Sequence, residues 1–336
     1  MVSMLRTEAF RERLAGGRRE AAELEVDGHR APAAAIWAAL LSVWVFWGGT
    51  YLAIRVVVRT MPPFLAASVR FLVAGAILYA VAVRRGDRVG DRPTRTQWIA
   101  ATIVGGSLLL GGNGLVMFAE QSVPSGIAAL IIASVPLWLA TIDRIVFGRR
   151  LSWVAVMGLA IGFGGLALLI DPTGGGRLDP AGVAALVVAS LSWAGGSLYA
   201  RHAPLPKRPL VGTGMEMLAG GVLLALVGAG RGELARVDLA AVSTGSVLGL
   251  VYLIVFGSLV AFAAYVWLLR VTRTTLVSTY AYVNPVVAVF LGWAVLSEPI
   301  TLRTLVAGGI IVLAVAVIVS ARPVRERPEA SAPAEP

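Results

Sequence analysis

The sequence predicts an all-α integral membrane protein with ten transmembrane helices, arranged as two inverted five-helix repeats with both termini in the cytoplasm. Of its 336 residues, 57% are hydrophobic and only 14% are charged, whereas soluble globular chains carry about 25% charged residues. Ten apolar runs approach the length that crosses about 30 Å of hydrocarbon. The two halves of the chain also resemble each other at an offset of about 147 residues.

Composition excludes several classes of function. The chain has 29 Lys and Arg residues against 19 Asp and Glu, a net charge of +10, two histidines and no cysteine. Without cysteine there is no disulfide, no thiolate nucleophile and no iron–sulfur ligand. His29 and His202 stand alone in polar segments, so we expect neither a metal site nor a cofactor.

Ten apolar runs define the predicted spans. Each run is close to the 20 residues that a transmembrane helix needs, and short loops rich in glycine, proline and charge separate them. The predicted spans are residues 34–58, 63–83, 97–119, 125–147, 151–170, 180–200, 210–229, 242–269, 274–297 and 302–320.

Basic residues in the loops predict the orientation, because cytoplasmic loops retain Lys and Arg. With the N-terminus inside, 21 basic residues lie on the cytoplasmic side and five on the other. We therefore expect a multi-pass protein of the cytoplasmic (inner) membrane, and no nucleic-acid partner, because this bias accounts for the basic charge. The expected parts are a cytoplasmic tail 1–33, a first repeat 34–171 with spans one to five, a second repeat 178–320 with spans six to ten, and a cytoplasmic tail 321–336.

An internal repeat relates the two halves. The offset of about 147 residues places FWGGTYLA of the first span on SWAGGSLYA of the sixth, and ASVPLW of the fourth on YVNPVV of the ninth. Five spans per repeat is an odd number, so the second copy enters the membrane in the opposite sense. Inverted repeats of this kind are typical of transporters.

Two charges lie deep in the predicted spans and occupy equivalent repeat positions, Arg70 in the second span and Glu216 in the seventh. Each lies on the N-terminal side of its span centre, so inversion places the two at different depths and predicts no direct ion pair. A lipid-facing charge there costs at least about 2.5–3.5 kcal/mol, so each needs a polar neighbour, water or a substrate. Arg70 is a candidate for substrate binding or a structural anchor. Glu216 is a candidate for proton coupling, because a carboxylate can take a proton, with recognition of a positive group on the substrate as the alternative.

Several segments carry a family resemblance: FWGGTYLAIR, MPPFLAASVRFLVAG, GNGLVMFAEQSVPSGIAALIIASVPLW, SWAGGSLYAR, FGSLVAFAAYVWLLR and STYAYVNPVVAVFLG. In this order they resemble the paired EamA domains of the drug/metabolite transporter superfamily, and are similar to its ten-span, YedA-like exporter branch. The resemblance implies a ten-helix bundle with a central cavity and efflux of amino acids, metabolites or drugs. One departure is visible: the acidic hinge residue of this pattern is kept as Glu298 in the second repeat but is Arg149 in the first.

Two prolines near the middle of spans four and nine are candidate hinges. Pro136 and Pro285 each remove a backbone donor and free a carbonyl four residues earlier, at the depth where discontinuous helices build substrate sites. A simple packing kink is the alternative. Tyr280 and Asn284 lie one turn apart on the same helix face, which makes them candidates to line a cavity.

Aromatic and amide side chains complete the candidate site. Trp47 and Tyr51 belong to an aromatic stripe on span one that either lines the cavity or serves ordinary helix packing, and Trp193 repeats the pattern on span six. Asn113 lies midway along span three and is expected to face the interior. Glu120 ends span three and is a candidate gate, with a solvated charge at the rim as the alternative.

Together these observations predict a secondary active transporter, expected to export small organic solutes by alternating access and to use protons through Glu216. Its partners would be a small-molecule substrate, protons and the lipid bilayer. Import, gradient-independent facilitation or exchange of the same solutes, and a membrane scaffold without transport, remain alternatives. An enzyme is not expected, because catalysis needs convergent acids, histidines or metal ligands and the ionisable groups in the spans are isolated.

Overall fold

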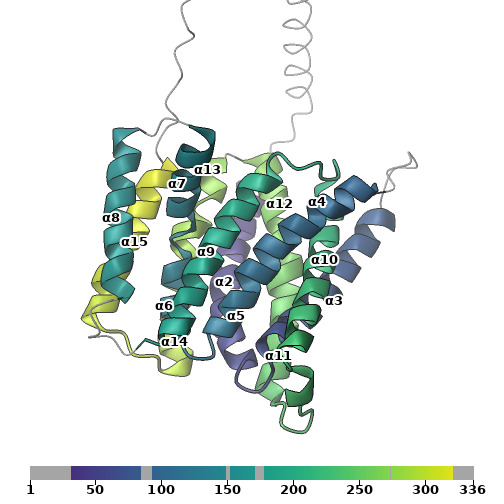
Figure 1. Ribbon diagram of the computed structural model, residues 1–336. Helices are drawn as coiled ribbons and strands as arrows, with labels where there is room; N and C mark the ends of the chain where they lie inside the picture. Colours follow the sequence, from purple (N-terminus) through teal and green to yellow (C-terminus); the bar gives the residue numbers. More distant parts are fainter. Residues whose placement is uncertain (1–31, 85–92, 149–151, 171–177, 273, 321–336) are drawn as a thin grey trace, which may run out of the picture. The chain divides into compact units, whose positions relative to one another are not determined.

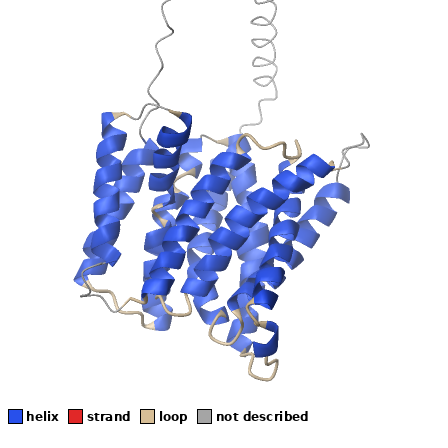
Figure 2. Ribbon diagram, in the orientation of Figure 1, coloured by secondary structure: helices blue, strands red, loops and turns tan. Residues whose placement is uncertain are grey.

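A computed structural model of the chain describes residues 32–84, 93–148, 152–170, 178–272 and 274–320. These residues form helices joined by turns and loops, with no strand among them (Figure 2). Backbone contacts divide the chain into two units, Met1–Trp37 and Ala38–Pro336. Of the first unit, only residues 32–37 are described, and they begin the first helix. The predicted tail 321–336, nearly all of the predicted tail 1–33, and Arg149 lie outside the described residues.

The helices follow the predicted order of spans (Figure 1). The first half contains α2 (Ala33–Val57), α3 (Pro63–Arg84), α4 (Arg95–Gly105), η1 (Gly106–Gly114), α5 (Leu115–Ala119), α6 (Ser125–Ile132), α7 (Val135–Phe147) and α8 (Trp153–Ile170). The second half contains α9 (Pro180–Ala200), α10 (Pro209–Gly230), η2 (Leu234–Arg236), α11 (Thr244–Tyr252), η3 (Leu253–Val260), α12 (Ala261–Val271), α13 (Thr274–Val277), α14 (Tyr280–Leu296) and α15 (Leu302–Ser320).

Nine stretches of helix among the described residues are long and apolar enough to cross a membrane. They correspond to nine of the ten predicted spans. The remaining one, predicted at 274–297, is divided into α13 and the 17-residue α14. The division falls at Ser278 and Thr279, where the Thr279 hydroxyl donates to the carbonyl of Leu276 at 2.7 Å. Such local hydrogen bonds offer the backbone an alternative to a continuous helix.

The two predicted hinge prolines lie in different surroundings. Pro136 is in the first turn of α7, just after α6 has ended, where a missing N–H costs little. Pro285 lies inside α14 and is buried. The fourth span is therefore discontinuous before its proline, whereas α14 continues through its proline.

Glycines allow several helix pairs to pack closely. A Cβ added at Gly75 of α3 would lie 2.8 Å from the Cβ of Met217 on α10. One added at Gly158 of α8 would lie 2.8 Å from Ile318 of α15, which runs beside it (Figure 1). Small residues let helices approach in membranes, where hydrophobic burial does not drive their association.

Two spans contain long π-helical segments, η1 in the third and η3 in the eighth. They begin at residues 106 and 253, an offset of 147 residues. π-Helices are rare and usually occupy a single turn at functional sites. Their presence at matching positions in the two halves directs attention to the side chains around them.

Candidate functional site

Three aromatic rings, Trp47, Tyr265 and Tyr280, form a group that we call the aromatic cluster. The ring centroid of Trp47 lies 5.3 Å from that of Tyr265 and 5.2 Å from that of Tyr280, and the two tyrosine rings are 5.8 Å apart. The three residues come from α2, α12 and α14. Such spacing is favourable for aromatic pairs. The cluster therefore joins the first span to the eighth and ninth.

The aromatic cluster is anchored on η3. The indole N–H of Trp47 donates to the main-chain carbonyl of Gly257 at 2.9 Å. The absence of a side chain at Gly257 also leaves room for Arg70. A Cβ at this position would lie only 3.3 Å from Nη2 of Arg70. The glycine thus allows the cluster and the arginine to meet at one point of the π-helix.

Arg70 is buried, with 5% of its surface exposed. Its Nε donates to the hydroxyl of Ser258 at 3.0 Å, and its guanidinium carbon lies 4.6 Å from the ring centroid of Phe71. Its Nη1 is buried and has no hydrogen-bond partner. A buried guanidinium with an unused donor is costly, and this unused donor is available to an anionic or carbonyl group of a ligand.

Asn284 is a second buried polar group without a full set of partners. Its side-chain oxygen Oδ1 has none, and 9% of the residue is exposed. Its main-chain carbonyl packs on Gly48 of α2, the residue after Trp47. A Cβ on Gly48 would lie 3.2 Å from this carbonyl oxygen. Tyr51, one turn further along α2, lies near Glu120 and Tyr280. Of the predicted site residues, Trp47, Tyr51, Arg70, Tyr280 and Asn284 are therefore brought together around α2.

Trp193 and Asn113 lie around the other π-helix. The ring of Trp193 packs on Gly112 of η1, 2.7 Å from where a Cβ would stand. Asn113 donates from its amide nitrogen to the carbonyl of Leu108, within the same span, at 3.3 Å. These two predicted site residues therefore pack between η1 and α9, in contacts separate from those of the aromatic cluster.

Glu216 has different neighbours from Arg70. It is half-buried on α10, and its main-chain carbonyl packs on Gly105 of α4. Arg70 instead donates to Ser258 on η3. This is consistent with the expectation that the two charges form no direct ion pair.

Glu120 follows the span that ends at Ala119 and is fully buried. The alternative of a solvated charge at the rim is therefore wrong. Both of its carboxylate oxygens lack a hydrogen-bond partner, whereas its main-chain carbonyl accepts a bond from the guanidinium of Arg55. Burial raises the pKa of the Glu120 carboxyl well above its usual range; the carboxylate of Glu298 raises this pKa further, and Arg55 lowers it.

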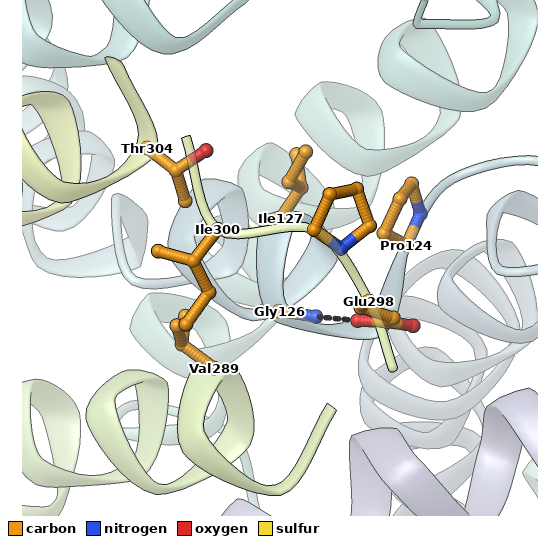
Figure 3. A pocket seen from close by; sticks show the side chains of 8 residues that line it. Pro124, Gly126, Ile127, Val289, Glu298, Ile300 and Thr304 are labelled. Atoms are coloured by element: carbon orange, nitrogen blue, oxygen red, sulfur yellow. Dashed lines mark hydrogen bonds between the residues drawn. The ribbon is translucent and has the colours of Figure 1, made fainter. Parts of the chain in front are cut away.

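Glu298 holds the beginning of α6. Its carboxylate accepts from the main-chain N–H of Ser125 at 2.8 Å and from the hydroxyl of Ser125 at 2.9 Å. It also accepts from the main-chain N–H of Gly126 at 3.1 Å, the bond that Figure 3 shows. It neighbours a hollow of about 10 Å³, room for one water molecule. The lining residues are Pro124, Gly126, Ile127, Val289, Glu298, Pro299, Ile300 and Thr304. This hollow is too small for an organic solute.

A profile of the EamA-like transporter family matches the chain twice, at residues 33–171 and 180–320. The chain belongs to this family. It is 40% identical over 289 residues to the "Uncharacterized inner membrane transporter YedA" of Escherichia coli K12, covering 84% of this chain and 90% of that protein. It is 28% identical over 285 residues to a chloroplastic WAT1-related protein of Arabidopsis thaliana, covering 83% of this chain and 68% of that protein.

One solved structure supports the fold of this EamA-family chain. It aligns with a TM-score of 0.57 at 22% identity, over 84% of this chain and 96% of its own. With multiple membrane-spanning helices and a membership in a transporter family, the chain is an integral membrane protein related to transporters rather than to enzymes.

The sequence pattern missed three site residues of this EamA-family chain. Tyr265 completes the aromatic cluster, and Gly257 and Ser258 receive Trp47 and Arg70. All three lie in the segment FGSLVAFAAYVWLLR, which carried the family resemblance but contains no deep charge. At the offset that aligned the repeats, Gly257 and Ser258 fall on Leu110 and Gly111, close to the candidate Asn113, and this was the signal that could have identified these two.

Proposed function

We propose that this chain is a secondary active transporter that exports small organic solutes by alternating access. The observation that carries the proposal is the meeting of Arg70 and the aromatic cluster at Gly257 and Ser258 of η3. Aromatic walls with a few well-placed polar groups are characteristic of small-molecule sites. The unused donor on Arg70 and the unused acceptor on Asn284 provide two polar contacts of opposite kind.

Ten spans in two inverted repeats are part of the same proposal, with the repeats at 34–171 and 178–320. Three lines of support are the two family matches, the offset of 147 residues between the π-helices, and the pairing of equivalent helices. The pairs α3 with α10, α6 with α14, and α8 with α15 are in contact. Each pair joins equivalent spans of the two repeats, and an axis that relates two repeats brings equivalent spans near it together. The loop charges favour both termini in the cytoplasm.

Proton coupling is proposed through Glu216. It is the deep carboxylate at the repeat position of Arg70, and it is half-buried rather than enclosed. A carboxylate can be neutral while buried and ionised when water reaches it, which an arginine cannot do.

Pro136 and Pro285 are the proposed hinges, since each lies in a span that contacts the other half.

Counterflow in proteoliposomes tests this function. The protein would be reconstituted and offered labelled amino acids and cationic dyes, with and without an imposed pH gradient. We expect exchange of at least one solute and a response to the gradient. Arg70→Lys should lose exchange, because a lysine keeps the charge but not the planar fork of donors, whereas the exposed-site control Gln121→Ala should keep it.

Glu216→Gln separates coupling from binding. We expect this variant to exchange solute while ignoring the pH gradient. Exchange that still responds to the gradient would refute coupling through Glu216. Absence of flux for every solute in the wild-type protein would instead favour a scaffold, and flux driven inward by the gradient would favour import.

A further inference from the structure

Three carboxylates hold helix beginnings at one end of the bundle, which we call the Glu120 end because Glu120 lies there. Glu298 accepts three bonds from the start of α6, as described above. Glu233 accepts from the main-chain N–H of Leu65 at 2.9 Å, in the first turn of α3. Asp179 caps α9 and accepts from the hydroxyl of Ser122 at 2.6 Å. Each belongs to the second half and receives a donor from the first half.

Glu120 differs from these three in having no donor. Its exposed fraction is 0%, and neither carboxylate oxygen has a partner. An ionised carboxylate in such a place would lose its hydration with no hydrogen bond to replace it, a cost of several kcal/mol. The packing is therefore compatible with the protonated carboxyl and not with the charged one.

The charges around Glu120 oppose its ionisation more than they favour it. Arg55 of α2 is near, but its guanidinium is engaged by the main-chain carbonyl of Glu120 and not by the carboxylate. Glu298 places a negative charge close enough to disfavour a second one. Other titratable or charged groups on the elements that begin or end here are Tyr51 and Arg59 in or after α2, Asp179 before α9, Arg231, Glu233, Arg236 and Asp238 after α10, and Arg303 in the first turn of α15.

We propose that Glu120 is a proton-binding site that controls opening of the Glu120 end. With its proton bound, Glu120 stays buried beside Glu298, which holds the start of α6. When the proton leaves, Glu120 becomes a second negative charge beside Glu298, and the end relaxes by admitting water to Glu120 and releasing the start of α6. Opening of this end would serve alternating access, so the use of this site rests on the proposed function, although its test does not.

Thiol labelling in a chain without native cysteine can measure this opening directly. Val123 is fully buried, with 0% of its surface exposed to water. Its main-chain N–H donates to the carbonyl of Ala119, the residue before Glu120. A single cysteine at Val123 would be labelled with a water-soluble thiol reagent. Its rate would be divided by that of a single cysteine at the exposed Gln121, which cancels the ionisation of the thiol itself.

We expect this ratio to rise at least about threefold between about pH 5 and about pH 8, because opening follows loss of one proton. Glu120→Gln, which imitates the protonated form, should keep the ratio low and flat, and Glu120→Asp should restore the rise.

Glu233→Gln is the matched control. Glu233 is as buried as Glu120, but its carboxylate accepts a hydrogen bond, so this variant should keep the rise. A flat ratio with Glu120 present, or an unchanged rise in Glu120→Gln, would overturn the proposal. Neither result depends on finding a transported solute.

Discussion

Replacement of Gly105 by alanine tests the close packing of α4 on α10. A Cβ at position 105 would overlap the main-chain carbonyl oxygen of Glu216 and lie 3.0 Å from the main-chain nitrogen of Gly220. Both are backbone atoms, so no side chain can rotate away. The two helices must separate instead, and the contact between them must weaken.

The magnitude follows from two opposing terms. Overpacking of this kind typically costs about 1–3 kcal/mol, and a gap of about 0.5–1 Å forfeits a quarter to a half of each local dispersion contact. Against this, alanine is favoured over glycine within a helix by about 0.5–1 kcal/mol. Gly164 on α8 provides the matched control, because a Cβ there meets nothing within 4 Å. Because both variants gain the same helix preference, we expect them to differ by the overpacking cost, about 1–3 kcal/mol, with Gly164→Ala the more stable.

The assay is thermal unfolding of both purified variants in the same detergent, followed by tryptophan fluorescence. For a chain of this size, a change of 1 kcal/mol shifts the midpoint by roughly 2 °C, so Gly105→Ala should unfold several degrees below Gly164→Ala. An equal or higher midpoint for Gly105→Ala would refute the reasoning, because it would mean that α4 does not approach the backbone of α10 so closely.

Two further predictions concern the carboxylates of the Glu120 end. Glu298→Ala should lower the free energy of unfolding in the same assay by about 1–3 kcal/mol, because it leaves the main-chain donors of Ser125 and Gly126 unpaired; a change indistinguishable from wild type would show that water replaces the carboxylate at no cost. The pKa of Asp179 is held below its usual range by the Ser122 hydroxyl and the Gly182 main-chain N–H, so its contribution to stability is complete above about pH 4 and is lost as the pH falls through the lower, folded-state pKa. Midpoints measured at decreasing pH should fall more steeply for wild type than for Asp179→Asn, and parallel curves would contradict this capping role.

The arrangement of spans could be predicted from the sequence because bilayer thickness fixes their length. The approximate depth of Arg70 followed from the same reasoning. Its partner did not, because Ser258 lies 188 residues away and only the packing of α3 against η3 brings the two together. Hydropathy also could not foresee the break at Thr279, where the hydroxyl and the main-chain N–H of Thr279 both donate to the carbonyl of Leu276.

Glu120 shows where a sequence-based prediction fails in this chain. Its place at the end of a span suggested contact with water. In the structure, the turn after α5 returns at once to α6, and Val123 and Ser125 are fully buried on its other side. Position along a span predicts depth, but burial at its end depends on the path of the loop.

The π-helical segments also change how mutational scans of this family should be interpreted. In an α-helix, the residues that face one side recur every 3.6 positions. Hydrogen bonds from i to i+5 enlarge the turn, so the residues of α5 and α12 are out of phase with those of α4 and α11. A helical wheel drawn without interruption through either span would therefore assign the residues after η1 or η3 to the wrong face. Lipid-facing and interior positions are better assigned separately for the helix before and the helix after each π-helical segment.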